Sequence, residues 1–287
     1  MIYKVYFICS MIIFGSIGLI VREIPLSSAE IAMVRGVIGS TFLIVTASSL
    51  KKKPSLKKIK RNLIYLAISG GALGINWILL FEAYRYTSIT NATLSYYLAP
   101  VIVVLMSPIL LKEKLSLQKL LCVLVAMAGM ILLVWTGRYE SFYGGDIKGI
   151  GFGLAAATFY ALVVLMNKLT KDIDGLGATI VQLTLASFIL IPYVLSKRTI
   201  PWNILGGNAI LRLLVVGFLN TGIAYLLYFS SVQKLKSQTV AILSYIDPVS
   251  ALVMSAVFIG EKITIPQLLG GILILGSALI SGRDSLK

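Results

Sequence analysis

Long apolar stretches alternate with short polar connections along the whole chain. A helix needs about 20 mostly apolar residues to cross the hydrocarbon core of a bilayer, and ten stretches approach that length. We predict ten transmembrane helices, at residues 3–21, 31–50, 63–81, 88–111, 117–136, 147–167, 176–195, 210–230, 237–259 and 265–282. The connections are too short to hold a soluble unit. The pattern therefore predicts an all-α membrane protein in which residues 1–287 form a single membrane domain.

The composition supports a membrane protein and argues against an enzyme. Apolar residues make up 58% of the 287 positions, charged residues only 13%, and mean hydropathy is +0.93, whereas soluble domains carry roughly 25% charged residues. The absence of histidine removes the commonest metal ligand and general base, and the sequence contains no G-x-x-x-x-G-K-[ST] phosphate loop. We therefore expect no metal, no cofactor and no use of ATP. An intramembrane aspartyl protease would need a second acid near the middle of the bilayer, which the sequence lacks.

The net charge of +15 is unevenly distributed. Seven of the 26 Lys and Arg residues lie between Lys51 and Arg61, in the connection between two apolar stretches, and such clusters mark cytoplasmic loops. With both termini in the cytoplasm, 17 basic residues lie on that side and 8 on the other, with Arg35 inside a span. The sequence therefore predicts an N-in, C-in protein whose basic residues meet the lipid bilayer and not nucleic acid. The first apolar stretch is expected to be a retained span, not a cleaved signal peptide.

The second half of the chain repeats the first. Residues 91–129 recur at 239–277, a shift of 148 positions. This shift crosses five spans, an odd number, so the second copy must lie upside down relative to the first. We predict two inverted five-helix repeats, 1–139 and 147–287, which would let a central cavity open to either side in turn. Nine pairs of residues are identical in the two copies: Tyr97/Tyr245, Pro100/Pro248, Val101/Val249, Met106/Met254, Ser107/Ser255, Glu113/Glu261, Lys114/Lys262, Leu120/Leu268 and Leu121/Leu269.

Several short motifs occur in a characteristic order. Arg35 lies early in the second stretch, YRYTS occupies 84–88, LAPV occupies 98–101, FIGEKI occupies 258–263, and the tenth stretch is rich in glycine. In this order and over nearly its whole length, the chain resembles the drug/metabolite transporter superfamily, specifically its EamA branch. The resemblance implies transport of small metabolites, often amino acids or amines, through a cavity lined chiefly by spans 1, 3, 4, 6, 8 and 9.

Asp247 is the leading candidate for the substrate site. It lies about halfway along the ninth stretch, where a charged side chain costs about 2.5–3.5 kcal/mol on insertion scales and usually faces a cavity. Its carboxyl group could bind an ammonium group or a proton, or it could act as a structural joint between helices; Ala99 is its counterpart in the first copy. Pro248 and its counterpart Pro100 cannot donate a backbone hydrogen bond, so we expect a helix break near each.

Two further charged residues are candidates near the outer ends of the spans. Arg35 could bind a substrate carboxylate in bidentate fashion, snorkel outward, or pair with Glu30 or Glu82 as a gate. Glu82 closes the third predicted span, and we expect it to gate or cap the site more than to touch substrate. Glu113-Lys114 and Glu261-Lys262 end the fourth and ninth spans, where they would act as latches at opposite mouths or set the depth of the helix ends.

Amides and aromatic rings complete the candidate set. Asn76 in the third span and Asn220 in the eighth could orient a ligand or hold helices together, at roughly 0.6–2 kcal/mol each. Aromatic walls suit an apolar side chain or an alkylammonium group held by cation–π attraction, although each ring could equally pack between helices. The aromatic candidates are Phe14, Trp77, Tyr96, Tyr97, Tyr160, Tyr225, Tyr228 and Tyr245.

Together these features predict a secondary active or facilitative transporter of a small organic metabolite such as an amino acid or amine. We expect a multi-pass protein of the bacterial cytoplasmic membrane, exporting by alternating access, with Asp247 as a point of proton coupling. Both a monomer and a homodimer are compatible with the sequence. The alternative is an organic-anion or phosphorylated-metabolite exchanger of the same fold, whose cavity would need several buried Lys or Arg residues.

Overall fold

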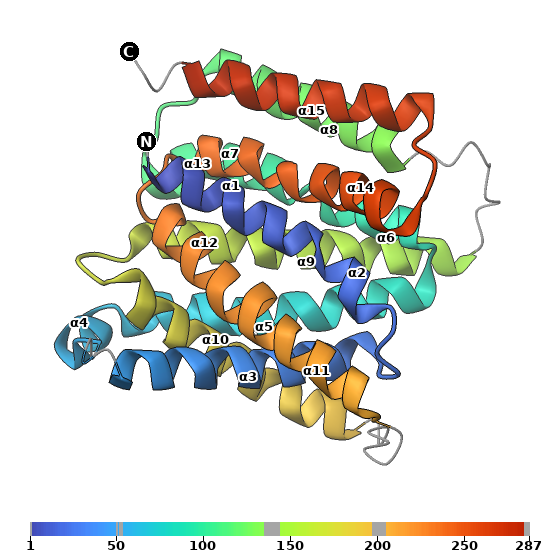
Figure 1. The fold of residues 1–287 in the computed structure, drawn as a ribbon. Coiled ribbons are helices and arrows are strands. Elements are labelled where there is room, and N and C mark those ends of the chain that lie inside the picture. The colour runs from blue at the N-terminus through green and yellow to red at the C-terminus, as the bar shows by residue number, and fades with distance from the viewer. Residues whose placement is uncertain (1, 50, 52–53, 135–143, 197–204, 284–287) are drawn as a thin grey trace.

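The computed structural model describes residues 2–49, 51, 54–134, 144–196 and 205–283, and within them every regular element is a helix (Figure 1). Most of the predicted boundary between the repeats, residues 139–147, lies outside the described part of the chain. The helices are α1 (Ile2–Gly15), α2 (Ile17–Val21), α3 (Ser28–Ser49), α4 (Leu56–Arg61), α5 (Leu63–Tyr86), α6 (Ile89–Tyr96), α7 (Ala99–Leu111), α8 (Leu117–Val134), α9 (Gly144–Leu169), α10 (Gly175–Ser196), α11 (Gly207–Val215), the π-helical η2 (Val216–Ile223), α12 (Ala224–Val232), α13 (Ser237–Ser244), α14 (Ile246–Ile259) and α15 (Ile265–Arg283).

The described part of the chain contains nine helical stretches long and apolar enough to cross a membrane. The tenth apolar stretch forms a shorter apolar helix, Ile265–Ser281, within α15. The predicted span at 63–81 was too short, because α5 continues to Tyr86 and carries Glu82 in its helical end. The all-α membrane architecture predicted from the sequence is confirmed.

Three of the spans are interrupted. The fourth splits into α6 and α7 around Tyr97 and Leu98, and the ninth splits into α13 and α14 at Tyr245. Each new helix has a proline in its first turn, Pro100 or Pro248, where the missing N–H costs no internal hydrogen bond. The first span is interrupted at Ser16, between α1 and α2.

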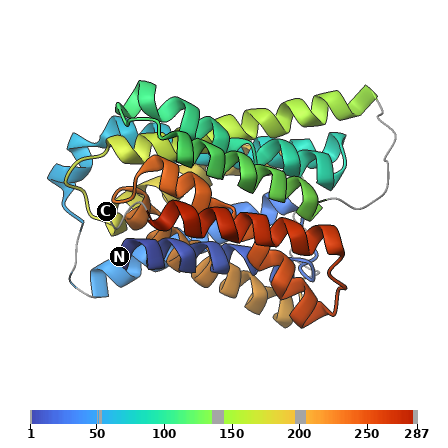
Figure 2. The ribbon, with the colours of Figure 1, turned by 90° about the horizontal axis from the view of Figure 1, so that it is seen from above.

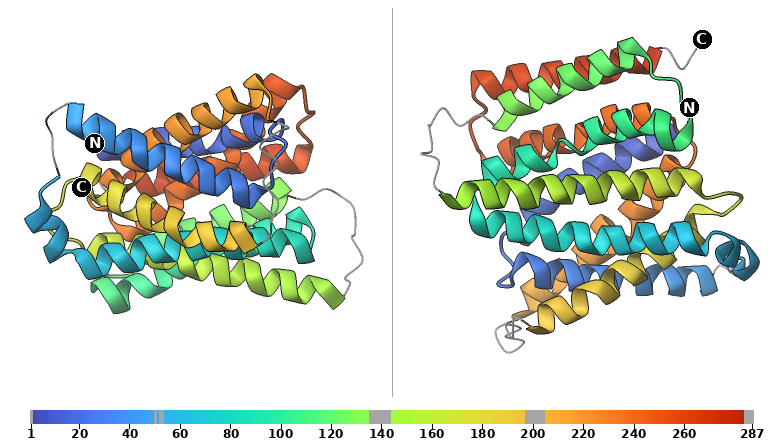
Figure 3. Two further views of the ribbon diagram at one scale, coloured as in Figure 1. Left: turned by 90° about the horizontal axis from the view of Figure 1, so that it is seen from below. Right: turned by 180° about the vertical axis from the view of Figure 1, so that it is seen from behind.

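Helix packing in the second half of the chain repeats the packing in the first. α5 packs on α9 and α10, and its counterpart after the 148-residue shift, η2 with α12, packs on α3 and α1. Likewise α7 lies against α9, as α14 lies against α1. Counterparts also pack on each other, α3 on α10 and α8 on α15. The α8–α15 pair forms one edge of the bundle, and α3, α10 and α11 lie at the other (Figures 1 and 3).

The two ends of the bundle differ in charge and in what they contain. The start of α1, the end of α15 and the Lys/Arg-rich α4 lie at one end, called here the basic end (Figures 1 and 2). The short helix α2 and the connection to α3 lie at the opposite end (Figure 1). The chain therefore leaves the bundle at the same end at which it enters.

Small residues and buried amides hold the layers together. A Cβ atom on Gly74 would lie 2.9 Å from the Ala186 carbonyl oxygen, so the absent side chain lets α5 approach α10 closely. Beside this contact, the buried Gln182 side chain of α10 accepts hydrogen bonds from Ser69 of α5 (2.5 Å) and Asn167 of α9 (2.8 Å). Gln182 is thus a packing residue.

We predict that Gly129→Ala destabilises the protein by disrupting the α8–α15 contact. A Cβ atom on Gly129 would lie 2.7 Å from the Gly270 carbonyl oxygen, and overpacking of this kind typically costs about 1–3 kcal/mol. Thermal unfolding in detergent measures the effect. Gly276→Ala in α15 is the matched control, because nothing lies within 4 Å of its added Cβ and alanine favours helix over glycine. Equal melting temperatures for the two variants would contradict the close contact.

Candidate functional site

A central cavity of about 580 Å³ lies among the first, second, third, fourth, sixth, eighth and ninth spans. Ile17 and Gly18 of α2 and Ile89 at the start of α6 line it, and these elements place the cavity toward the end opposite the basic end (Figure 1). Ile89 is 73% exposed, which places it at a mouth. The spans implied by the family resemblance all contribute, and the second span adds Arg35.

Asp247 lines this cavity from the break in the ninth span. It is the second residue of α14, where the positive end of the helix dipole favours a carboxylate. The Tyr97 hydroxyl donates to Asp247 Oδ2 at 3.5 Å, a long hydrogen bond. In the described part of the chain, no Lys or Arg nitrogen lies within 4.0 Å of this carboxyl group. The carboxyl group therefore faces the cavity without a cation of the described residues beside it.

Arg35 lines the same cavity from α3. Its guanidinium carbon lies 4.7 Å from the centre of the Trp77 ring, within range of a cation–π contact. Among the described residues it has no ion pair, and Glu30 and Glu82 bind other groups. The gate proposed from sequence between Arg35 and these glutamates is absent here. Arg35, Tyr225 and Asp247 thus line one cavity.

Aromatic rings form most of the remaining wall. The Phe14 and Tyr225 ring centres lie 4.9 Å apart, edge to face. The Tyr228 hydroxyl donates to the Tyr160 hydroxyl at 2.8 Å, and the Tyr160 ring meets that of Tyr96 at 5.8 Å. These contacts fix the rings before any ligand enters, so the wall offers a preformed set of π-faces.

Asn76, Asn220 and Tyr245 do not line the cavity, although the sequence placed them among the binding residues. The Asn76 amide donates to the Ala156 carbonyl of α9 at 2.7 Å. The Asn220 amide donates to the Ile13 carbonyl at 2.6 Å, beside the interruption of the first span. Both amides hold helices together because they satisfy carbonyl groups that the bilayer cannot.

Tyr245 joins the two interrupted spans. Its ring stacks on that of Tyr97, its counterpart in the first copy, with centres 6.2 Å apart. Its hydroxyl donates to the Tyr97 carbonyl oxygen at 2.9 Å. That carbonyl lies in the break between α6 and α7. Tyr245 is fully buried, so it positions Tyr97 and Asp247 from behind.

Tyr96 and Tyr228, which are among the aromatic candidates from the sequence, line the cavity, and so do several residues that were not singled out. Tyr96 and Ser244 line the cavity and occupy equivalent places in the two copies, as do Ala99 and Asp247. Thr93 and Tyr84 also line it, nearer the mouth. The repeat offset was the signal that could have added Ser244, because it is the counterpart of Tyr96 and lies three residues before Asp247.

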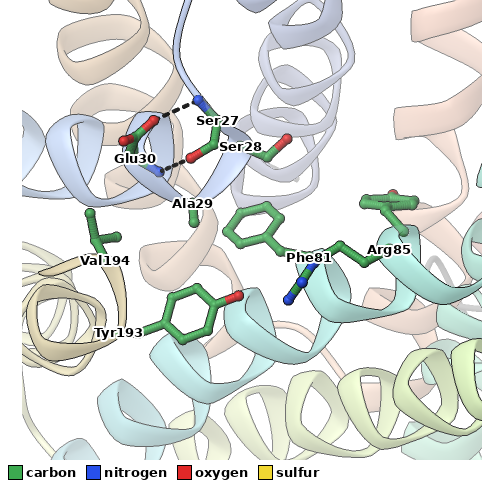
Figure 4. A pocket seen from close by; sticks show the side chains of 9 residues that line it. Ser27, Ser28, Ala29, Glu30, Phe81, Arg85, Tyr193 and Val194 are labelled. Carbon is green, nitrogen blue, oxygen red and sulfur yellow. Dashed lines mark hydrogen bonds between the residues drawn. The ribbon is translucent and has the colours of Figure 1, made fainter. Parts of the chain in front are cut away.

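A second pocket of about 500 Å³ adjoins the cavity and shares Phe81 and Tyr84 with it. Glu30 lies at its edge, where it accepts from the Ser27 N–H while the Ser27 hydroxyl accepts from the Glu30 N–H (Figure 4). These reciprocal bonds form a capping box that begins α3. Glu82, which the sequence suggested as a gate, pairs with Arg85 at 2.8 Å and accepts from the Tyr193 hydroxyl, which ties α5 to α10.

A helical bundle of this kind, with a charged aromatic cavity among interrupted spans, defines a multi-pass membrane transporter of small molecules. The chain belongs to the EamA-like transporter family, whose model matches residues 1–135 and again 147–283. The recognition made from sequence motifs is thereby confirmed.

Relatives and a solved structure agree with this assignment. The Bacillus subtilis protein named uncharacterized transporter YxxF is 31% identical over 98% of this chain and 89% of its own length. Protein RarD of Salmonella typhimurium is 26% identical over 81% and 78%, and solute carrier family 35 member G1 of Mus musculus is 27% identical over 88% and 70%. A crystal structure with 17% identity covers 99% of both chains at a TM-score of 0.85, which shows a shared fold.

We predict that Tyr245→Phe lowers the free energy of unfolding by about 1 kcal/mol, because it leaves the Tyr97 carbonyl without its hydrogen-bond donor. Thermal or denaturant unfolding in detergent measures the loss. Tyr6→Phe is the control, since that ring is 36% exposed on the outer surface of α1. If both variants unfold like the parent protein, the hydrogen bond from the Tyr245 hydroxyl to the Tyr97 carbonyl does not stabilise the fold.

Proposed function

We propose that this protein exports a small organic metabolite bearing an amine, such as an amino acid or an alkylamine, by alternating access. The observation that carries the proposal is Asp247, a carboxyl group that faces an aromatic cavity and whose one hydrogen bond is the long contact with Tyr97. Such a residue in a membrane span usually has a functional partner. A substrate ammonium group would supply the missing cation.

The aromatic wall fits the same substrate class. Tyrosine faces attract an ammonium or alkylammonium group at about 0.5–2 kcal/mol per contact, more when the contact is desolvated. Tyr96, Tyr97 and Tyr225 line the cavity with Asp247. Between the charged contacts, the rings would hold an apolar side chain.

Arg35 extends the substrate class to zwitterions. Its guanidinium group has no carboxylate partner in the described structure and can bind a substrate carboxylate through two parallel hydrogen bonds. Arg35 is also the single Lys or Arg among the described residues that line the cavity. One cation opposed by an acid suits a monocarboxylate better than a phosphorylated sugar, whose several negative charges need several cations.

Alternating access rests on two inverted repeats. The repeated helix packing, the equivalent breaks at Tyr97 and Tyr245, and the two separate matches to the family model support this arrangement. Placing the basic end in the cytoplasm follows the positive-inside rule. The cavity would then face outward here, and protonation of Asp247 on one side of the membrane would couple transport to a pH gradient.

We predict that amines and amino acids raise the melting temperature of the purified protein and fail to raise that of Asp247→Asn. A ligand that binds only the folded state adds about 2.7 kcal/mol at a hundred times its dissociation constant. A thermal-shift panel of amines, amino acids and phosphorylated sugars in detergent tests this. Asp174→Asn is the matched control, because Asp174 is exposed, lies before α10 and caps Gly177, a role that asparagine also fills.

The panel also tests the alternative function. If only phosphorylated sugars or other organic anions stabilise the parent protein, and Asp247→Asn responds equally, the amine proposal is wrong. An organic-anion exchanger centred on Arg35 then becomes the better description of the cavity.

We predict that Arg35→Gln separates zwitterions from simple amines. The loss of a charge-assisted bidentate contact should weaken amino-acid binding about tenfold or more, while binding of alkylamines that lack a carboxylate stays near the parent value. Titration calorimetry on each ligand that passes the thermal screen measures both affinities. Equal weakening for the two ligand classes would indicate that Arg35 maintains the shape of the cavity and does not bind the carboxylate.

A further inference from the structure

The Glu-Lys sequences that follow the fourth and ninth spans share one backbone geometry. α7 is capped by Lys112 and α14 by Gly260, which are counterparts in the two copies, and both have positive φ, 55° and 78°. A left-handed residue at this place turns the chain away from the helix axis. Glu113 and Glu261 follow directly, so each is presented at the end of its span, Glu113 at the basic end and Glu261 at the opposite end (Figure 1).

At the basic end, Glu113 binds the second copy. Its carboxylate accepts hydrogen bonds from the Ser237 N–H at 3.1 Å and the Ser237 hydroxyl at 3.3 Å. Lys168 Nζ lies 3.9 Å from the same carboxylate and donates to the Leu235 carbonyl. Because Ser237 is the first residue of α13, the Glu113 carboxylate caps that helix and is stabilised by the helix dipole. The contact ties the end of α7 to the start of α13.

At the opposite end, the identical residue Glu261 is arranged differently. It is exposed, and the Ser255 hydroxyl of its own copy donates to it. The start of α6, the counterpart of α13, is capped instead by Ser88, which accepts from the Asn91 N–H at 3.2 Å. Ser107, the counterpart of Ser255, donates within its own helix to the Val104 carbonyl at 3.0 Å. Ser255 and Glu261 are thus hydrogen-bonded to each other, whereas Ser107 and Glu113 bind other groups.

Helix packing shows the same asymmetry. α7 and α13 pack on each other, whereas their counterparts α14 and α6, both described throughout, make at most marginal contact. The cavity reaches the end where α6 and α14 are apart. The basic end is therefore the closed end. There Glu113 is separated from Ser107 and bound to the start of α13.

We propose that Ser107/Glu113 and Ser255/Glu261 form two alternating latches that set the side to which the cavity opens. When the cavity faces the basic end, Glu261 leaves Ser255 and binds the N-terminus of α6 at Ile89, the counterpart of Ser237. Glu113 then leaves α13 and returns to the Ser107 hydroxyl. The structure displays both states of the latch at once, one at each end. This inference rests on the alternating access proposed above.

The two latches differ in two residues, and the first of these, Ser237, has as its counterpart Ile89, which carries no hydroxyl group. Lys168, which supports the closed latch at the basic end, has Ile20 as its counterpart in the first copy. The latch at the basic end therefore has a cation that its counterpart lacks, and it should hold more firmly. This difference accounts for a resting conformation that is closed at the basic end.

Cysteine accessibility in membrane vesicles tests the latches. With Cys9 and Cys122 replaced, Thr93→Cys reports on the outward cavity, and Ala241→Cys, at its counterpart position, reports on the closed end, where Ala241 is 1% exposed. We expect Glu113→Gln to raise the labelling rate at position 241 about tenfold with a membrane-impermeant thiol reagent applied at the basic end, and to lower labelling at position 93. Lys168→Ile and Ser255→Ala should act in the same direction, and Glu261→Gln in the opposite one.

Asp172→Asn is the matched control, since Asp172 pairs with Arg61 at 3.2 Å in the connection between α9 and α10. If Glu113→Gln labels like this control, while an amine or amino acid from the thermal panel still shifts labelling between positions 93 and 241, the latch is overturned and the transport proposal stands. If neither a ligand nor any variant exposes position 241, alternating access and the latch are both wrong.

Discussion

Backbone polar groups within the membrane spans must find partners without help from bulk water, and the interrupted spans make this constraint acute. An unsatisfied group in hydrocarbon costs several kcal/mol, so breaks are tolerated where protein buries them or where they line a cavity. The breaks in the fourth and ninth spans meet both conditions. The Tyr245 hydroxyl satisfies the Tyr97 carbonyl, and the residues that follow each break, Ala99 and Asp247, line the cavity. The same rule explains why the Asn220 amide donates to the Ile13 carbonyl beside the interruption of the first span.

This arrangement places charge where a substrate can use it. A break leaves the first N–H groups of α14 without helical partners, and the dipole that they carry favours the Asp247 carboxylate beside them. Arg35 lies over Trp77 elsewhere in the same cavity. Two opposite charges in one aromatic chamber, neither neutralised by the protein in its described part, match the two charged ends of the proposed amino-acid substrate. A cavity lined by one sign of charge would not discriminate in this way.

The asymmetry between the two ends suggests how such a cavity could change sides. A change of state requires two packings that differ by only a few kcal/mol. Identical Ser–Glu pairs in the two copies provide such alternatives, because one pair would join as the other separates. The total number of hydrogen bonds then changes little during the proposed exchange. Lys168, without a basic counterpart, supplies the small bias that would select one resting state.

The spans, their helical nature and the family were predictable from the sequence, because the bilayer demands apolar helices of a certain length. Asp247 was identifiable for a related reason, since a charge in such a stretch is costly and therefore uncommon. The sequence could not separate Tyr97, which lines the cavity, from Tyr245, which supports it from behind, because both are tyrosines at equivalent places in the two copies.

The roles of Asn76, Asn220 and Glu82 were likewise decided by tertiary structure. Each side chain has partners on another span, and only the packing of helices distant in sequence shows whether a polar group meets a carbonyl, a hydroxyl or an open cavity. Hydropathy depends on one residue and its neighbours along the chain, so it determined which segments enter the membrane. Which helix faces pack against each other depends on the simultaneous fit of all the helices. Only the tertiary structure decided this.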